Sequence, residues 1–272
     1  MAFKTRRGTV DLAGRSIAYS ASGPGDGTAV CVHGFGSDRS VWSFNVPALV
    51  TGRTVYALDL PGHGESEPRL DPGGLDELTE VTAGFLAALS LSRVHLIGHS
   101  LGGAIAIRLA ADHPEVVAGL TLVAPAGIAP PGSGLSISGT FLDAFLAMQT
   151  AEDAGAVLRD LVAKPSLISP DMAAGVAEHM SRSGVRTTLA AIVGNAIRRD
   201  LADGALRQTL LSLEMPVEII WGAEDAIIPV ASADTLPGSI PVHRIAGAGH
   251  LVQMEKSPAI NRLMAEQAAR MG

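Results

Sequence analysis

Residues 94–112 read VHLIGHSLGGAIAIRLAAD, an apolar run, a turn rich in glycine and a segment with helical periodicity. The run 94–98 predicts a strand, and 101–112 predicts a helix. The turn between them has the pattern Gly-x-Ser-x-Gly, centred on Ser100. In a tight strand-to-helix turn the serine takes a strained backbone conformation, which requires small residues two positions before and after it. The pattern therefore predicts Ser100 as a nucleophile rather than as an ordinary helix N-cap residue.

Other apolar runs of similar length surround this stretch. Their near-continuous hydrophobicity is typical of strands buried on both faces of a parallel sheet. A helical pattern at 75–90 separates two of them, and alternating strands and helices indicate a layered α/β domain with right-handed crossovers. The runs are 29–33, 54–60, 120–124, 217–221 and 241–245.

The alternation stops between residues 127 and 211, which we call the cap segment. It opens with a stretch rich in glycine and proline and then shows only helical patterns. One crossover rarely needs so many residues, so we predict a helical insertion over one end of the sheet. The predicted core is then 1–126 and 212–272. The helices are expected at 139–150, 151–163, 170–181 and 185–200.

A serine nucleophile needs a base and an acid that orients the base. Asp225 follows the predicted strand 217–221, and His250 follows the strand-like 241–245. Both lie at the sheet edge where open α/β sheets place their sites. Their chain order with Ser100 is the order expected for this turn motif. Glu224 is the alternative acid.

A tetrahedral intermediate also needs donors for its oxyanion. The backbone N–H of Leu101, directly after the nucleophile, is the first expected donor. The second is the N–H of Phe35, in the glycine-containing loop after the strand 29–33. We expect His33 and His63 to make loop hydrogen bonds, and the His99 side chain to point away from that of Ser100.

Composition excludes several classes of function. The 272 residues are 47% hydrophobic, which rules out a disordered chain. A net charge of −7 argues against nucleic-acid binding. The single cysteine, Cys31, excludes an intrachain disulfide and any multi-cysteine metal site. No targeting segment and no apolar run of about 18 residues is visible, so we expect a cytoplasmic protein with no membrane partner, metal or cofactor.

Taken together, the motifs resemble the α/β-hydrolase superfamily. This resemblance implies an eight-stranded, mostly parallel sheet flanked by helices, with a helical cap inserted after strand 6. It also implies Ser100 as nucleophile, Asp225 as acid and His250 as base. The matching stretches are His33-Gly34-Phe35-Gly36, residues 59–66, Gly98 to Gly103, Gly222 to Asp225 and Gly249-His250.

The chain resembles two groups within the superfamily more closely than the others. Residues 119–127 and 249–255 resemble the hydrolase-like C-terminal domain of acyltransferase components of acetoin dehydrogenase complexes, here without a lipoyl domain. The chain also resembles the C–C bond hydrolases of ring-fission products. Those usually have Trp after the catalytic histidine and Asn before the serine, where this chain has Leu251 and His99.

The expected function is hydrolysis of small-molecule carboxylic esters or thioesters with small to medium acyl groups, through an acyl-enzyme. C–C bond or lactone hydrolysis by the same residues is one alternative, and a non-catalytic small-ligand binding protein is another. The oligomeric state stays open. Arg182, Arg186, Arg198 and Arg199 are candidates for holding a substrate carboxylate. The expected pocket residues are Gly34, His99, Phe141, Phe145, Met148, Ile227 and Leu251.

Overall fold

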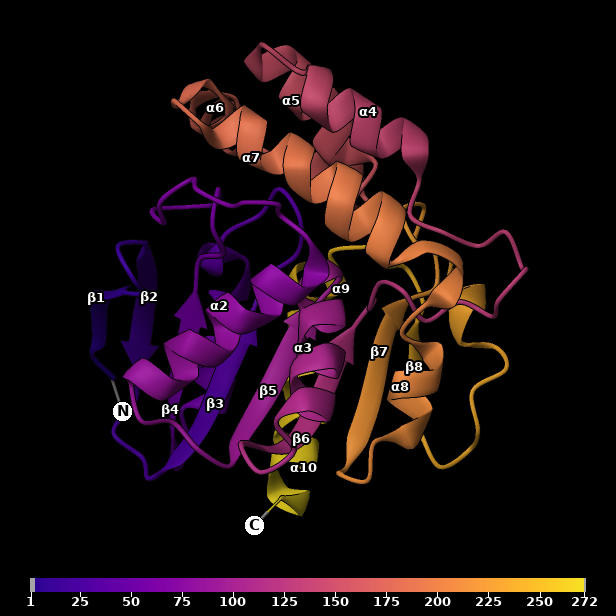
Figure 1. The fold of residues 1–272 in the computed structure, drawn as a ribbon. Coiled ribbons are helices and arrows are strands. Elements are labelled where there is room, and N and C mark those ends of the chain that lie inside the picture. Colours follow the sequence, from indigo (N-terminus) through magenta and orange to yellow (C-terminus); the bar gives the residue numbers. More distant parts are fainter. Residues whose placement is uncertain (1–2, 272) are drawn as a thin grey trace.

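The computed structural model describes residues 3–271, and its eight strands form one sheet (Figure 1). Their order is β1-β2-β4-β3-β5-β6-β7-β8. The pairs β1–β2 and β2–β4 are antiparallel, and every other neighbouring pair is parallel. The predicted eight-stranded, mostly parallel sheet is therefore confirmed. The strands are β1 (Thr5–Asp11), β2 (Ser16–Ser22), β3 (Gly27–Val32), β4 (Arg53–Leu58), β5 (Val94–His99), β6 (Val117–Val123), β7 (Val217–Gly222) and β8 (Val242–Ile245).

The β1–β2 hairpin at the edge of the sheet lies outside every apolar run in the sequence. Most β1 side chains are exposed, so this strand carries polar and charged residues. Its turn contains Ala13 and Gly14 with φ of 54° and 80°, the paired positive values of a tight hairpin. The central strands were predicted from their hydrophobic runs. An edge strand that faces solvent can be polar, so this criterion does not detect it.

Helices cover both faces of the sheet. Val30 and Val32 of β3 pack in one core with α2 and α3, while the alternate residues Ala29 and Cys31 pack in a second core with α10. Strand side chains alternate between faces, so a strand buried on both sides is apolar throughout. Within residues 3–271, no helix combines the length and apolar character needed to cross a bilayer. The flanking helices are α1 (Val46–Leu49), α2 (Leu75–Ala88), α3 (Leu101–Asp112), α8 (Arg207–Ser212), α9 (Val252–Glu255) and α10 (Ser257–Arg270).

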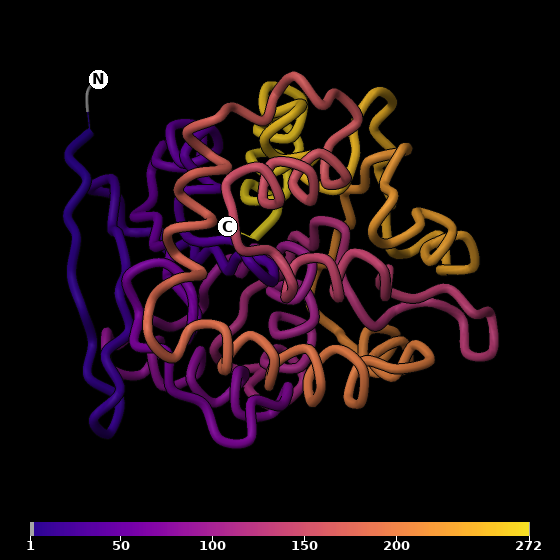
Figure 2. The backbone as a smooth tube through the Cα atoms, turned by 90° about the horizontal axis from the view of Figure 1, so that it is seen from above, coloured from indigo at the N-terminus to yellow at the C-terminus, as the bar shows by residue number. Residues whose placement is uncertain are grey.

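The cap segment places helices above the carboxyl ends of the parallel strands (Figures 1 and 2). They are α4 (Gly139–Ala147), α5 (Ala151–Arg159), α6 (Pro170–Ser181) and α7 (Val185–Ile192), which continues as the π-helix η3 (Val193–Asp200). Short 3₁₀ turns are η1 (Arg39–Trp42), η2 (Pro165–Leu167), η4 (Ala202–Gly204) and η5 (Val230–Ala233). α8 packs against α3 beside the sheet, so the predicted boundary at residue 212 cuts through a helix of the core layer. The division into two domains stays a prediction.

A row of polar side chains crosses four parallel strands, buried in β5, β6 and β7 and partly exposed in β8. His95 of β5 donates to the Thr121 hydroxyl at 2.8 Å, and that hydroxyl donates to Glu218 of β7 at 3.0 Å. His243 of β8 lies 3.5 Å from the other Glu218 oxygen. Burial raises the pKa of Glu218 to about 7, and burial lowers the pKa of His95 to about 3. The sheet therefore contains a carboxyl group that titrates near neutral pH.

Candidate active site

Ser100 stands at the turn from β5 into α3, with φ of 54° and ψ of −115°. A side chain at Gly98 would overlap the backbone of Gly102, and one at Gly102 would overlap the carbonyl oxygen of Val32. Both positions therefore require glycine for steric reasons. The Ser100 N–H donates to the Val123 carbonyl at 2.9 Å, which holds the turn against β6. The strained serine conformation is thus built from close packing on both sides.

His250 and Asp225 come together from the loops after β8 and β7. His250 Nδ1–H donates to Asp225 Oδ2 at 2.8 Å, and Trp221 Nε1–H donates to the same oxygen at 3.0 Å. Asp225 Oδ1 accepts from the N–H groups of Ile227 and Ile228 at 2.8 and 2.9 Å. Four hydrogen bonds fix this buried carboxylate. Because Nδ1 carries the proton of the neutral ring, Nε2 of His250 is left as the basic atom.

Glu224, the alternative acid, points elsewhere. Its two carboxylate oxygens accept from the N–H groups of Gly247 and Ala248 at 3.1 and 2.8 Å, and these hydrogen bonds lower the pKa of Glu224. It therefore supports the loop that leads to His250. The structure joins Asp225, and not Glu224, to the His250 ring, although the catalytic role of Asp225 stays a prediction.

His99 lies beside His250 rather than in isolation. Its Nε2–H donates to the His250 carbonyl at 3.0 Å, and the two ring centroids are 4.7 Å apart. Burial lowers the pKa of His99, so its ring is neutral at physiological pH. A Cβ added to Gly34 would lie 2.8 Å from His99 Nδ1 and 2.9 Å from Ser100 Cβ. His99 thus fixes the His250 loop, and Gly34 leaves room for both neighbours.

Two backbone N–H groups near Ser100 are free. Within residues 3–271, neither the Phe35 N–H nor the Leu101 N–H donates to another protein group. Both residues line the same cavity as Ser100. A pair of unsatisfied donors beside a nucleophile is the arrangement that stabilises an oxyanion. Their assignment as the oxyanion hole stays a prediction.

Histidines hold the loop that carries Phe35. His63 Nε2 accepts from the Gly36 N–H at 3.0 Å, and His33 Nε2 accepts from the Leu60 N–H at 3.0 Å. Each ring donates its Nδ1–H to a nearby carbonyl group, at 2.8 Å for His33 and 2.9 Å for His63. Burial lowers the pKa of both histidines, which keeps these acceptor nitrogens unprotonated. The predicted loop hydrogen bonds of His33 and His63 are therefore confirmed.

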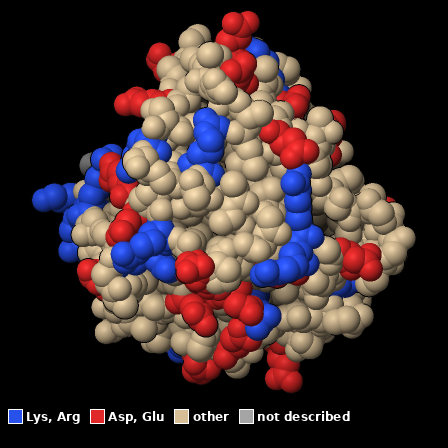
Figure 3. Space-filling view, turned by 45° about the horizontal axis from the view of Figure 1, so that its top comes forward, with Lys and Arg blue, Asp and Glu red and all other residues tan. Residues whose placement is uncertain are grey.

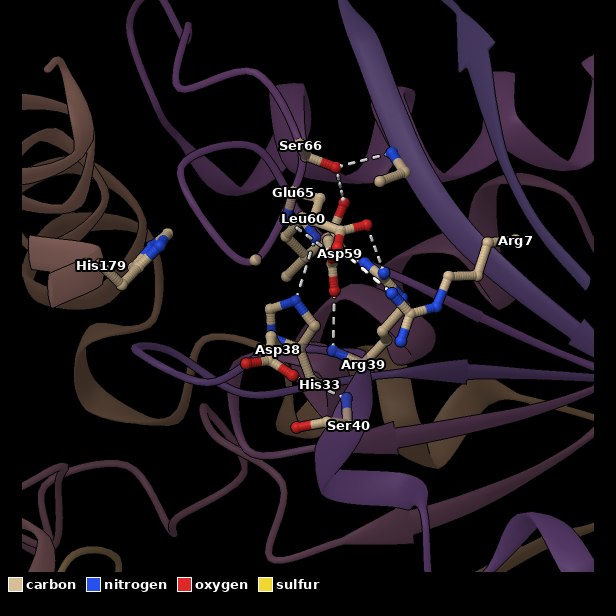
Figure 4. A network of polar contacts seen from close by, with 12 residues as sticks. Arg7, His33, Asp38, Arg39, Ser40, Asp59, Leu60, Glu65, Ser66 and His179 are labelled. Atoms are coloured by element: carbon tan, nitrogen blue, oxygen red, sulfur yellow. Dashed lines mark hydrogen bonds and ion pairs between the residues drawn. The ribbon is translucent and has the colours of Figure 1, made fainter. Parts of the chain in front are cut away.

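Asp59 ties the same loop to its neighbours (Figure 4). Its buried carboxylate accepts from the Arg39 N–H at 2.7 Å and the Glu65 N–H at 2.8 Å, and it pairs with the Arg39 guanidinium. The Ser66 hydroxyl donates to the Asp59 carbonyl at 2.7 Å and accepts from the Ala18 N–H at 2.8 Å. A charged side chain buried with this many partners fixes the backbone around it. Segment 59–66 therefore supports the Phe35 loop.

The cavity above Ser100 has a volume of about 500 Å³ and is mostly apolar. Of the expected pocket residues, His99, Phe141, Phe145, Ile227 and Leu251 line it, together with Ser100 and His250. Gly34 and Met148 do not. Gly34 is packed against His99 and Ser100, and buried Met148 ends α4 with its carbonyl group accepting from Arg186. The Ser100 hydroxyl makes no hydrogen bond to His250 in the described chain, and such contacts often tighten only around substrate.

No Lys or Arg side chain among residues 3–271 lines this cavity. The four cap arginines do not line the cavity, and each has another partner: Arg182 donates to the carbonyl group of Gly64 at the cavity wall, Arg186 donates to the Met148 carbonyl group, Arg198 pairs with Asp143, and Arg199 pairs with Asp200. Figure 3 shows the charged side chains of this face around a largely uncharged central area. The expectation that a cap arginine holds a substrate carboxylate is therefore not supported by the geometry.

Some residues that line the cavity were not predicted from the sequence. Met172, Val176 and Met180 of α6 all line the cavity, and their spacing of four residues forms one helix stripe. The sequence analysis did not use this spacing, which is a signal that could have indicated a cavity wall on this helix. His179 also lines the cavity while donating to the Gly62 carbonyl at 3.0 Å. No sequence pattern pointed to it, because its direction depends on how α6 packs.

Comparison with known proteins agrees with the fold described above. The family model described as alpha/beta hydrolase fold matches residues 29–257. The dihydrolipoyllysine-residue acetyltransferase component of the acetoin cleaving system of Pseudomonas putida is 37% identical over 258 residues, which cover 93% of this chain and 67% of that protein. The predicted resemblance to this group is confirmed.

Two further similar proteins are named as hydrolases. The 2-hydroxy-6-oxononadienedioate/2-hydroxy-6-oxononatrienedioate hydrolase of a Pseudomonas species is 29% identical over 271 residues, covering 94% of this chain and 92% of that protein. The solved structure of a meta-cleavage product hydrolase from Pseudomonas fluorescens IP01 superposes with a TM-score of 0.84 at 22% identity, covering 97% of this chain and 98% of that chain. Family match, sheet order and turn geometry agree: this chain belongs to the α/β-hydrolase fold family.

Proposed function

We propose that this protein is a serine hydrolase that cleaves carboxylic esters or thioesters with apolar acyl groups. The observation that carries the proposal is the Asp225–His250 hydrogen bond of 2.8 Å beside a serine in a strained turn. These groups face an apolar cavity that also contains two free N–H donors. Nucleophile, base, orienting acid and oxyanion donors are the parts that acyl transfer requires.

The first half of the reaction acylates Ser100. Its Oγ attacks the substrate carbonyl carbon while His250 Nε2 removes the hydroxyl proton. Asp225 holds the ring in the tautomer that leaves Nε2 free, and stabilises the imidazolium. The N–H groups of Phe35 and Leu101 receive the oxyanion. His250 then gives its proton to the leaving alcohol or thiol, and the acyl group stays on Ser100.

The second half removes the acyl group. Water enters where the leaving group stood, and His250 Nε2 takes its proton during attack on the acyl carbonyl. The same two N–H groups stabilise the second tetrahedral intermediate. Collapse of this intermediate returns the proton to Ser100 and releases the acid.

The lining of the cavity favours an ester over the acids of the C–C bond hydrolases. The name of the Pseudomonas relative describes a dioate, which is a molecule with two carboxylates. Burying an ionised carboxylate without a charged or hydrogen-bonding partner is strongly unfavourable. Serine hydroxyl groups and His179 in this cavity can donate hydrogen bonds, but no Lys or Arg among the described residues lines it to balance a carboxylate charge, and Asp38 and Asp171 add carboxylates to its lining. A neutral ester with an aliphatic acyl group fits these surroundings better.

A substrate panel tests this proposal. We expect turnover of p-nitrophenyl butyrate, slower turnover of a matched lactone, and kcat/KM for a vinylogous diketone dicarboxylate at least about 100-fold lower than for the ester. Preferred cleavage of the dicarboxylate would establish the C–C bond alternative. No turnover of any substrate, together with no labelling by a fluorophosphonate probe, would indicate a binding protein instead.

A further inference from the structure

A second cavity lies next to the catalytic cavity. It has a volume of about 340 Å³ and is bounded by the 127–139 connection and by η3 and η4. In Figure 1 this connection runs beside the lower end of the long α7–η3 helix. Three side chains line both cavities: Ile137, Leu142 and Ile197. The partition between the two cavities is therefore a single layer of side chains.

The partition is aliphatic, and two of its three side chains are buried while Ile137 is partly buried. Leu142 on α4 is 2% exposed and Ile197 on η3 is 6% exposed. On its far side the second cavity is lined largely by apolar residues, including Pro125, Ile128 and Leu201. The charged residues at its edge have partners: Arg198 pairs with Asp143, and Asp203 accepts from the Gly132 N–H. Both compartments therefore suit hydrocarbon.

We propose that the two cavities form one divided acyl pocket, and that Ile137, Leu142 and Ile197 set the length of acyl chain that the enzyme accepts. This inference rests on the proposed ester hydrolysis, because it assigns the catalytic cavity to the acyl group. Phe141 and Phe145 line the catalytic cavity but not the second cavity. The partition then meets the distal end of the chain.

Chain-length preference follows from the hydrophobic effect. Each methylene that enters an apolar cavity raises binding about fourfold, at about 0.8 kcal/mol per buried CH₂. The gain stops where the chain reaches the partition, because the next methylene must displace a packed side chain. We therefore expect kcat/KM to rise with acyl length, reach a maximum and then fall. Replacing a partition residue by a smaller one opens the second cavity to the acyl chain, so the maximum of kcat/KM moves to longer chains.

The test uses p-nitrophenyl esters from acetate to dodecanoate with the full-length protein. In Ile197→Ala and Leu142→Ala, the ratio of kcat/KM for decanoate to that for butyrate should rise at least about 15-fold, the value of two additional buried methylenes. In Ile197→Phe, the maximum should move to shorter chains. Thermal unfolding identifies variants that fail to fold, and Ile197→Val is a milder change with the same expected direction.

Val193→Ala is the matched control. Val193 lies on the same π-helix as Ile197, is 1% exposed, and lines neither cavity. Its chain-length profile should equal that of the wild type. Unchanged profiles in folded Ile197→Ala and Leu142→Ala, or a shift of equal size in Val193→Ala, would overturn the divided pocket.

A binding experiment separates this inference from the proposed function. Affinities of straight-chain 1-alkanols, from butanol to dodecanol, are measured by calorimetry in Ser100→Ala and in Ser100→Ala with Ile197→Ala. An affinity maximum at a longer alkanol in the double variant than in Ser100→Ala supports the divided pocket even if the wild type hydrolyses no ester. If esters are hydrolysed but neither alkanol affinity nor the ester profile moves, the proposed function stands and the divided pocket is wrong.

Discussion

Replacing Asp225 by Asn removes one charge and changes one hydrogen-bond acceptor into a donor. The Asp225 carboxylate accepts four hydrogen bonds, two at each oxygen. The amide oxygen of Asn can replace Oδ1, which accepts from the Ile227 and Ile228 N–H groups. The amide NH₂ then takes the position of Oδ2 and faces two donors, His250 Nδ1–H and Trp221 Nε1–H.

The histidine can relieve this conflict only by moving its proton to Nε2. Nδ1 then accepts from the amide, and the atom that should remove the Ser100 proton is already protonated. A change of this kind in a serine triad lowers kcat about 10⁴-fold, which corresponds to about 5 kcal/mol of transition-state stabilisation. Trp221 Nε1 keeps its second acceptor, the Ile228 carbonyl at 3.1 Å. We therefore expect a stability loss of only about 1–3 kcal/mol.

The assay is steady-state hydrolysis of p-nitrophenyl butyrate, with thermal unfolding of the same preparations. Asp234→Asn is the matched control, because Asp234 pairs with Arg244 at the surface and does not line the catalytic cavity. It should keep wild-type kcat. Glu224→Gln should cost far less than Asp225→Asn. A folded Asp225→Asn enzyme with more than a tenth of wild-type kcat, or a larger loss in Glu224→Gln, would refute the reasoning.

Three further changes test other parts of the account. Ser100→Ala should lower kcat for the ester by close to ~10⁶-fold at an unchanged melting temperature, and retention of a few per cent of activity would exclude this nucleophile. Gly34→Ala places a Cβ 2.8 Å from His99 Nδ1 and 2.9 Å from Ser100 Cβ, so kcat should fall about 100-fold because the serine is displaced. Full activity would show that the loop accommodates the added Cβ without moving Ser100. Glu218→Gln tests the buried row by chemical denaturation across pH. The raised pKa means that the wild type has the full stability contribution of Glu218 below pH 4.5 and loses it as pH rises to about 7, by at most about 3 kcal/mol. The variant should lack this loss, and parallel pH curves for the two proteins would contradict it.

The central sheet and the candidate catalytic residues were predictable because their local sequence carries the constraint. Strands buried on both faces must be apolar throughout, and the turn at Ser100 tolerates only glycine at positions 98 and 102. Asp225 and His250 follow strand ends, and parallel strands bring their carboxyl ends to one edge of a sheet. Topology therefore determines which loops meet, even before side-chain positions are known.

Features that depend on packing between segments were not predictable. Strand β1 faces solvent at the edge of the sheet, so its sequence lacks the apolar run that identifies a central strand. Met148 is as apolar as Phe145, but the chain leaves the helix at Met148, and its side chain is excluded from the cavity. The second cavity depends on how the 127–139 connection sits against η3. No single segment contains that information.

The central claim is that Ser100 carries the acyl group during turnover. The most direct measurement is mass spectrometry of the intact protein and its peptides after acid quenching of a reaction with p-nitrophenyl acetate. The account predicts an acetyl group on the peptide that contains Ser100, lost by hydrolysis when quenching is delayed, and absent in Ser100→Ala and in His250→Ala. Ester turnover without any acyl adduct, or with an adduct on another residue, would contradict it.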